Sequence, residues 1–208
     1  MTLSSLRRTA FLALAGIVAA APASAHHPMG GETPTNFTQG FVSGLAHPVI
    51  GLDHLAFILA VGVAVGVGGL SLFLPIVFVA TSAVGVALHV NGLNLPGAEL
   101  IVAASVVIAG VLIARGRELP LAAWGALFGL AGLAHGYAYG ESIFGAEPTP
   151  LYAYLLGLVV IQSAIAVGTA ILVRRSGAGV SAMAPRLAGA VVIGVGLTAL
   201  MGQIIPGA

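Results

Sequence analysis

Cysteine and lysine are both absent from this 208-residue chain, and only 6% of its residues are charged. Without cysteine, the chain has no disulfide, iron–sulfur cluster, c-type haem or thiolate metal site. Without lysine, it has no P-loop and no Schiff-base chemistry. Soluble domains carry roughly 25% charged residues, and nucleic-acid binding requires a basic surface that a net charge of +1 does not provide. With 59% hydrophobic residues, the composition indicates a polytopic membrane protein.

The first 25 residues are typical of a targeting signal. Two arginines precede an apolar stretch at 10–20, and the small-x-small sequence Ala23–Ala25 follows. The apolar stretch is shorter than the ~20 residues that a membrane span needs, although an uncleaved first helix is the alternative. We therefore predict a cleavable signal peptide at 1–25 and a mature chain that begins at His26.

The rest of the chain, residues 26–208, is predicted to form a single all-α domain, a six-helix transmembrane bundle. Most of its apolar runs have the ~20-residue length of a membrane-spanning helix. The first run is longer and contains Pro48, so we expect its helix to be bent, tilted or broken. The six predicted spans are Phe37–Val67, Leu70–His89, Ala98–Ala114, Leu119–Gly140, Leu151–Val173 and Leu187–Ile205.

The arginines predict the orientation of these spans. Those of the mature chain all fall after the third or the fifth span: Arg115, Arg117, Arg174, Arg175 and Arg186. Loops rich in arginine stay in the cytoplasm, so both of these loops are predicted to be cytoplasmic. The N- and C-termini then lie on the periplasmic side of a bacterial inner membrane, as a cleaved export signal also requires.

The histidines and most of the acids gather near the predicted outer side. Ionisable groups inside a membrane are costly and usually face a cavity, a partner or a ligand. Imidazole and carboxylate, without thiolate, suit Ni²⁺, Co²⁺ or Zn²⁺. The residues that we predict to contact a divalent metal are His26, His27, His47, Asp53, His54, His89, Glu99, His135 and Glu141.

The densest part of this set is the segment His47-Pro48-Val49-Ile50-Gly51-Leu52-Asp53-His54. In a straight helix, His47 and His54 would stand ~10 Å apart along the axis, too far to share one ion. Pro48 removes a helix hydrogen bond and Gly51 tolerates unusual dihedral angles. An unwound turn here would bring both histidines and Asp53 together, as broken helices do at transporter binding sites.

This segment resembles the signature of the HupE/UreJ membrane proteins, which are nickel or cobalt permeases associated with hydrogenase and urease maturation. The family's second signature reads approximately Phe-His-Gly-x-Ala-His-Gly-x-Glu, and residues 134–141 read Ala-His-Gly-Tyr-Ala-Tyr-Gly-Glu. Ala134 thus replaces the phenylalanine, Tyr139 replaces the second histidine, and one position before Glu141 is missing. The resemblance implies metal ligands at positions 47, 53, 54, 135 and 141. Glu99 is similar in placement to a further acid of the family, and His89 is a candidate to replace the absent imidazole.

Three classes of function fit these residues. The leading hypothesis is a secondary permease, not an enzyme, with Ni²⁺ or Co²⁺ (or Zn²⁺) as substrate, no resident cofactor and no nucleotide motif. The second is an intramembrane zinc hydrolase that uses the same ligands to activate water. The third is a b-type haem or quinone protein with histidines on facing helices. The predicted partners are the metal ion and the lipid bilayer, and the chain is compatible with a homo-oligomer.

Overall fold

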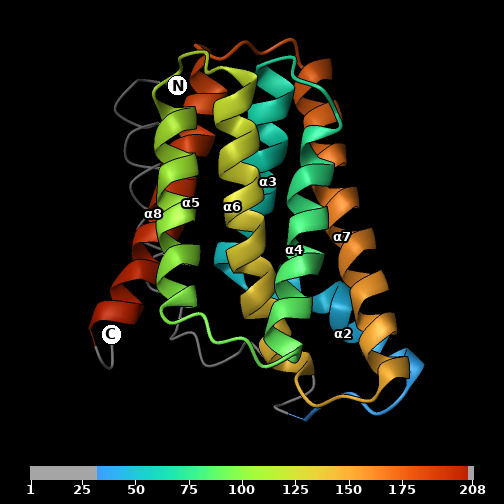
Figure 1. Cartoon of the computed structure of the whole chain (residues 1–208). Helices are drawn as coiled ribbons and strands as arrows, with labels where there is room; N and C mark the ends of the chain where they lie inside the picture. The colour runs from blue at the N-terminus through green and yellow to red at the C-terminus, as the bar shows by residue number, and fades with distance from the viewer. Residues whose placement is uncertain (1–31, 206–208) are drawn as a thin grey trace.

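Residues 32–205 are the part of the chain that the computed structural model describes, and they are helical without any strand (Figure 1). The predicted signal peptide, His26 and His27 lie outside this part. The all-α class is thereby confirmed. The helices are α2 (Phe37–Ile50), α3 (Leu52–Val67), α4 (Leu74–Val90), α5 (Ala98–Ala114), α6 (Leu121–Gly140), the 3₁₀ turn η1 (Glu141–Ile143), α7 (Pro148–Arg175) and α8 (Met183–Ile204).

The first predicted span is broken, as expected. Helices α2 and α3 meet at an angle of 79°, and the break is the single residue Gly51, with φ −73° and ψ 102°. Pro48 occupies the last turn of α2, where its missing N–H weakens the helix just before the break. A side chain on residue 51 would collide with the His54 ring, because its Cβ would lie 2.7 Å from His54 Cδ2. Glycine at the break therefore makes room for a histidine of the motif.

Helix length separates the predicted spans into two groups. Within 32–205, the helices that are long and apolar enough to cross a membrane are α6 together with η1, α7 and α8, and the bent pair α2–α3 adds a fourth if it counts as one span. Helices α4 and α5 are apolar but have 17 residues each, at the short limit for a span. The structure therefore supports a helical membrane protein, and the six-span count stays a prediction.

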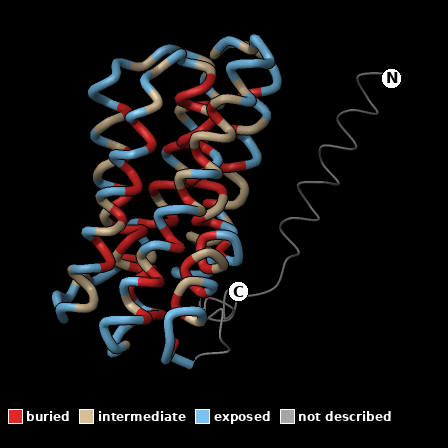
Figure 2. Tube along the Cα trace, turned by 90° about the vertical axis from the view of Figure 1, so that its right-hand side faces the viewer, coloured by how far each residue is buried: buried red, intermediate tan, exposed pale blue. Residues whose placement is uncertain are grey.

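The outer surface of the bundle is largely apolar, and exposing it to water would be unfavourable. Buried residues line the inside of the bundle, and its outer face is largely exposed (Figure 2). Large hydrophobic side chains project outward, for example Leu130 with 72% and Leu172 with 68% of their surface exposed. Contiguous apolar surface of this kind is expected where lipid surrounds the protein.

Helices α3 to α8 run up and down alternately, so each end of the bundle collects a defined set of residues (Figure 1). At the end where α5 and α7 finish lie Arg115, Arg117, Arg174, Arg175 and Arg186, and we call it the arginine end. Arg186 donates from Nε to the carbonyl of Ala114, 3.1 Å away, which stabilises the C-terminus of α5. The opposite end, where α3 and α5 begin, is called the histidine end.

Close helix contacts at glycines fix the positions of the side chains near the histidine end. Helix α6 packs mainly on α4, and α2 packs mainly on α7. A Cβ on Gly136 would collide with the Ser82 backbone of α4, and one on Gly44 would collide with the Tyr154 backbone of α7. Small residues allow this approach where lipid supplies no hydrophobic drive between helices. The backbone of α7 therefore passes close to the turn of α2 that carries His47.

Candidate metal-binding site

Three of the predicted histidines meet inside the bundle, and we call them, together with Tyr139, the histidine layer. His47 comes from α2, His54 from α3, and His135 and Tyr139 from α6; all four are buried. The ring centroids of His47 and His54 are 5.9 Å apart, and those of His54 and His135 are 4.9 Å apart. Tyr139 touches the first two rings, at centroid distances of 5.1 Å from His47 and 4.3 Å from His54. The break at Gly51 thus brings together two imidazoles that a straight helix would separate.

Hydrogen bonds around His135 determine which nitrogen of His54 carries a proton. Nδ1 of His135 is 2.8 Å from Nδ1 of His54, and Nε2 of His135 is 2.9 Å from Oγ of Ser105. The Ser105 hydroxyl donates to the Val102 carbonyl at 2.7 Å, so it accepts from Nε2–H of His135. Nδ1 of His135 then accepts from Nδ1–H of His54, so the neutral form of His54 has its lone pair on Nε2. Both ring nitrogens of His135 are used within the protein.

A second set of hydroxyl groups orients His47 in the same way. Nδ1 of His47 lies 2.9 Å from Oγ of Ser142 and 2.9 Å from the hydroxyl of Tyr154. Both hydroxyls donate to the carbonyl of Tyr139, at 3.2 Å and 2.8 Å respectively. They therefore accept from Nδ1–H of His47, whose lone pair is on Nε2 as well. Hydrogen bonds to Nδ1 are the usual way in which proteins prepare a histidine to bind a metal through Nε2.

Asp53 lies beside this layer at the first turn of α3. Its Oδ1 accepts from the backbone N–H of His54 at 2.9 Å, and its side chain is buried. A carboxylate at this position is favourable because the N-terminus of a helix carries a partial positive charge. Asp53 thus stabilises the start of α3 and places a negative charge next to His54.

The other predicted residues surround an open cavity at the histidine end. This cavity, which we call the outer cavity, has a volume of about 640 Å³, and His89, Glu99 and Glu141 line it together with Tyr137. The ring of His89 contacts that of Tyr137 at a tilt of 52°, with centroids 4.5 Å apart, and its buried Nδ1 has no hydrogen-bond partner among the described residues. The Tyr137 hydroxyl fixes the cavity wall by donating to the Leu93 carbonyl at 2.8 Å. Glu141 is exposed and therefore accessible to a dissolved cation.

The structure therefore separates the predicted metal ligands into two groups. One group, at positions 47, 53, 54 and 135, is buried, and the other, at positions 89, 99 and 141, faces the outer cavity. Across residues 32–205, the structure contains no set of three or more histidine, aspartate or glutamate side chains arranged to hold a metal ion. The His54–His135 hydrogen bond holds the Nδ1 atoms of these two rings against each other.

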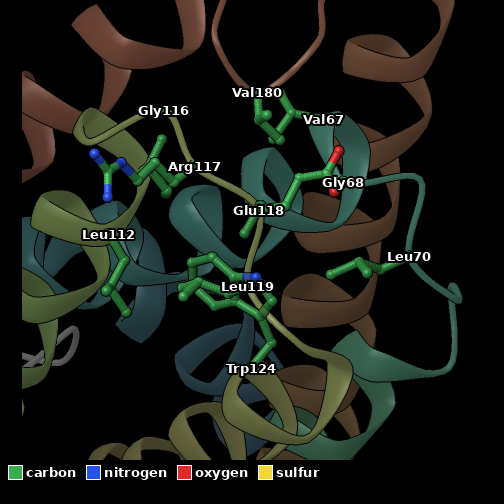
Figure 3. Close-up of a pocket in the computed structure, with 12 residues that line it drawn as sticks. Val67, Gly68, Leu70, Leu112, Gly116, Arg117, Glu118, Leu119, Trp124 and Val180 are labelled. Atoms are coloured by element: carbon green, nitrogen blue, oxygen red, sulfur yellow. The ribbon is translucent and has the colours of Figure 1, made fainter.

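A smaller cavity of about 130 Å³ lies at the arginine end, and we call it the inner cavity (Figure 3). Its lining comes from the end of α3, the end of α5, the loop that follows and the start of α6, and it includes Arg117, Glu118 and Trp124. The same three helices surround the histidine layer: α3 carries His54, α6 carries His135, and α5 carries Ser105, the hydrogen-bond partner of His135. The two features thus share the α3–α5–α6 side of the bundle.

Aromatic rings fill the space between the histidine layer and the inner cavity. The ring of Phe57 lies 4.6 Å from that of His135, and the ring of Phe128 lies 6.4 Å from that of Phe57. Trp124, which lines the inner cavity, follows at 5.5 Å from Phe128. Both phenylalanines are fully buried. In this conformation, apolar side chains close the bundle between the layer and the arginine end.

Comparison with known proteins identifies the family. The family described as HupE / UreJ protein matches residues 12–199. The chain belongs to the HupE/UreJ family. Protein HupE of Rhizobium leguminosarum bv. viciae is 33% identical to it over 134 residues, which cover 63% of this chain and 70% of that protein. No solved structure matches the chain.

Membership of the HupE/UreJ family confirms the resemblance that the first signature carries. The family is related to nickel and cobalt transport, which agrees with a protein that is not an enzyme. Several polar residues around the HupE/UreJ signature carried no signal in the sequence, because single serines and tyrosines are common in apolar helices. They are Ser105, Ser142 and Tyr154, which orient the histidines.

Proposed function

We propose that this protein is a secondary transporter that carries Ni²⁺ or Co²⁺ across the bacterial inner membrane. The observation that carries the proposal is the preparation of His47 and His54. Both are buried, both come from the broken first helix, and both are held with Nδ1–H engaged by protein groups, so that Nε2 is the nitrogen suited to a metal. A buried pair of neutral imidazoles beside the Asp53 carboxylate offers a divalent cation both ligands and charge compensation.

Transport through this layer requires a temporary rearrangement. A hydrated cation sheds water only where protein ligands replace it, and the layer supplies the imidazoles of His47 and His54 while Asp53 beside it supplies a carboxylate. We expect the His54–His135 hydrogen bond to open when the ion arrives, which frees His135 to turn toward it. Release requires moderate affinity, and a site that assembles only when the ion is present satisfies this condition.

The two cavities suggest a route on either side of the layer. We propose that Glu99, Glu141 and His89 attract the cation into the outer cavity before it reaches the histidine layer. Release would then proceed toward the inner cavity after Phe57 and Phe128 move apart. No observation favours a zinc hydrolase or a haem protein over this transporter.

Uptake of radioactive Ni²⁺ or Co²⁺ into proteoliposomes that contain the purified protein tests the proposal. We expect saturable uptake that empty liposomes do not show. Because imidazole must be deprotonated to bind a metal, uptake should decline as the external pH becomes acidic. Background-level uptake of both metals at every pH above 7 would contradict the proposed function.

Six spans with both termini in the periplasm are part of the proposal. The location of every arginine of residues 32–205 at one end of the bundle supports this orientation. Single cysteines introduced next to Arg115 or Arg174 should resist an impermeant thiol reagent in intact cells, because both loops would face the cytoplasm. A cysteine at Thr149, at the opposite end of the bundle, should react and serves as the control. Rapid labelling of the two arginine loops would overturn this topology.

A further inference from the structure

The hydroxyl of Tyr139 is a buried polar group for which the fold supplies no partner. Tyr139 is 0% exposed, and its hydroxyl has no hydrogen bond among the described residues. A buried hydroxyl normally finds a partner, since leaving one unsatisfied costs about 1–3 kcal/mol. The ring touches His47 and His54, so the unsatisfied group belongs to a residue in the histidine layer. It is also one of the positions at which the sequence departs from the second HupE/UreJ signature, where the signature has a histidine.

A neighbouring tyrosine shows that the fold can satisfy such a group. Tyr154 is equally buried, but its hydroxyl donates to the Tyr139 carbonyl and contacts both His47 and Ser142. These contacts position the His47 ring, so the Tyr154 hydroxyl has a structural role. The Tyr139 ring contacts the same His47 ring, but its buried hydroxyl makes no such bond among the described residues. Its retention in the layer is therefore explained better by a ligand than by the fold.

We propose that the Tyr139 hydroxyl binds a water molecule that the transported cation keeps in its coordination shell, and that Tyr139 thereby selects among divalent cations. The inference rests on the proposed function and adds the residue that determines specificity. A neutral phenol is a weak direct ligand, but it donates or accepts a hydrogen bond with a metal-bound water. His47 and His54 would each bind the ion through an imidazole nitrogen, and Tyr139 would form a hydrogen bond with a water molecule that remains on the ion.

Selectivity follows from the number of waters that each cation retains. Zn²⁺ usually binds four ligands in a tetrahedral arrangement, and protein groups can supply most of them. Ni²⁺ disfavours tetrahedral geometry and prefers a tetragonal arrangement, so at a site with few protein ligands it keeps water in the positions that the protein leaves open. A hydroxyl that binds retained water should therefore stabilise Ni²⁺ more than Zn²⁺.

The substitution Tyr139→Phe removes only this hydroxyl, and Tyr154→Phe is the matched control. Because the hydroxyl has no partner in the fold, Y139F should unfold in detergent at the same temperature as the parent, or at a higher one, when no metal is present. Y154F should unfold at a lower temperature, because it loses hydrogen bonds that the fold makes. In proteoliposomes, Y139F should need about five- to tenfold more Ni²⁺ for half-maximal uptake, while the value for Zn²⁺ changes less than about twofold.

The outcomes separate this inference from the proposed function. If the parent protein transports Ni²⁺ and Y139F keeps the same concentration dependence for Ni²⁺ and Zn²⁺, the role of Tyr139 is refuted and the transporter stands. If Y139F raises the concentration for half-maximal uptake equally for Ni²⁺ and Zn²⁺, the selectivity role of Tyr139 is refuted. Failure of Y139F to fold also refutes it, since the hydroxyl would then be structural. If the parent transports none of these metals, the proposed function and the role of Tyr139 fall together.

Discussion

The histidine layer and the outer cavity both contain side chains that can bind a metal, but those of the layer are buried and those of the cavity are open to solvent. In the layer, His54 and His135 are buried and hydrogen-bonded to each other at 2.8 Å. In the outer cavity, Glu141 is exposed and Glu99 is half-buried, around a volume of about 640 Å³. An exposed carboxylate attracts a cation without removing its water, whereas a buried imidazole must replace that water.

This difference assigns the two regions to different steps of the proposed transport. Residues of the cavity should govern how much metal the protein captures at low concentration. Residues of the layer should govern whether a captured ion passes at all. Substitutions of the same chemical type in the two regions should therefore affect different kinetic parameters.

The largest effect is expected from His54→Ala in the layer. It removes the Nε2 ligand and leaves Nδ1 of His135 without its partner, so Ni²⁺ uptake should fall at least about 100-fold, because even second-sphere changes at metal sites cost about 10–100-fold. Initial uptake rates in proteoliposomes provide the measurement. The matched control is His89→Ala, the same substitution in the outer cavity, which should keep most of the maximal rate. Similar maximal rates for the two variants would remove the distinction between the regions.

Asp53→Asn should have the next largest effect. Asparagine keeps an oxygen that can accept from the His54 N–H but deletes the charge, so we expect uptake about 10–100-fold lower. The free energy of unfolding should fall by less than about 1 kcal/mol, the usual contribution of an acid at a helix N-terminus. Glu147→Gln, which changes an exposed acid at the start of α7, is the control and should leave uptake unchanged. Parental uptake by D53N would show that its charge has no part in transport.

The smallest effect is expected in the outer cavity. Glu141→Gln removes an exposed negative charge, so the Ni²⁺ concentration for half-maximal uptake should rise about three- to tenfold while the maximal rate stays the same. Raising the ionic strength should reduce the difference, because salt screens exposed charges. Glu147→Gln, at an exposed acid that lines neither cavity, is the control for a change of the same charge. A lower maximal rate with an unchanged half-maximal concentration would instead place Glu141 in the transport step.

Much of the helical arrangement could be predicted from the sequence, because length and hydropathy define apolar helices. The third predicted span coincides with α5 at Ala98–Ala114, and Pro48 with Gly51 located the break in the first. Short helices such as α4 carry less information about whether they cross the membrane, so the number of spans is not settled by the same pattern.

The division of the candidate residues into two regions could not be predicted. His135 and Glu141 are six positions apart on or just after α6, yet the first is buried in the layer and the second faces the cavity. Which side of α6 faces inward depends on its glycine contacts with α4, for example at Gly136. Gly132, Gly136 and Gly140 recur every four residues, so the sequence indicates a close-packing face, but it does not indicate that α4 is the helix packed against it. The roles of Ser105 and Tyr154 were missed for the same reason.

X-ray absorption spectroscopy at the nickel edge on the metal-loaded protein tests most directly whether the histidine layer is the transport site. We predict the same number of imidazole ligands on the bound Ni²⁺ in the parent protein and in His89→Ala, and fewer imidazole ligands in His54→Ala. A number of imidazole ligands that falls in His89→Ala and is unchanged in His54→Ala would place the metal in the outer cavity and contradict the proposed role of the layer.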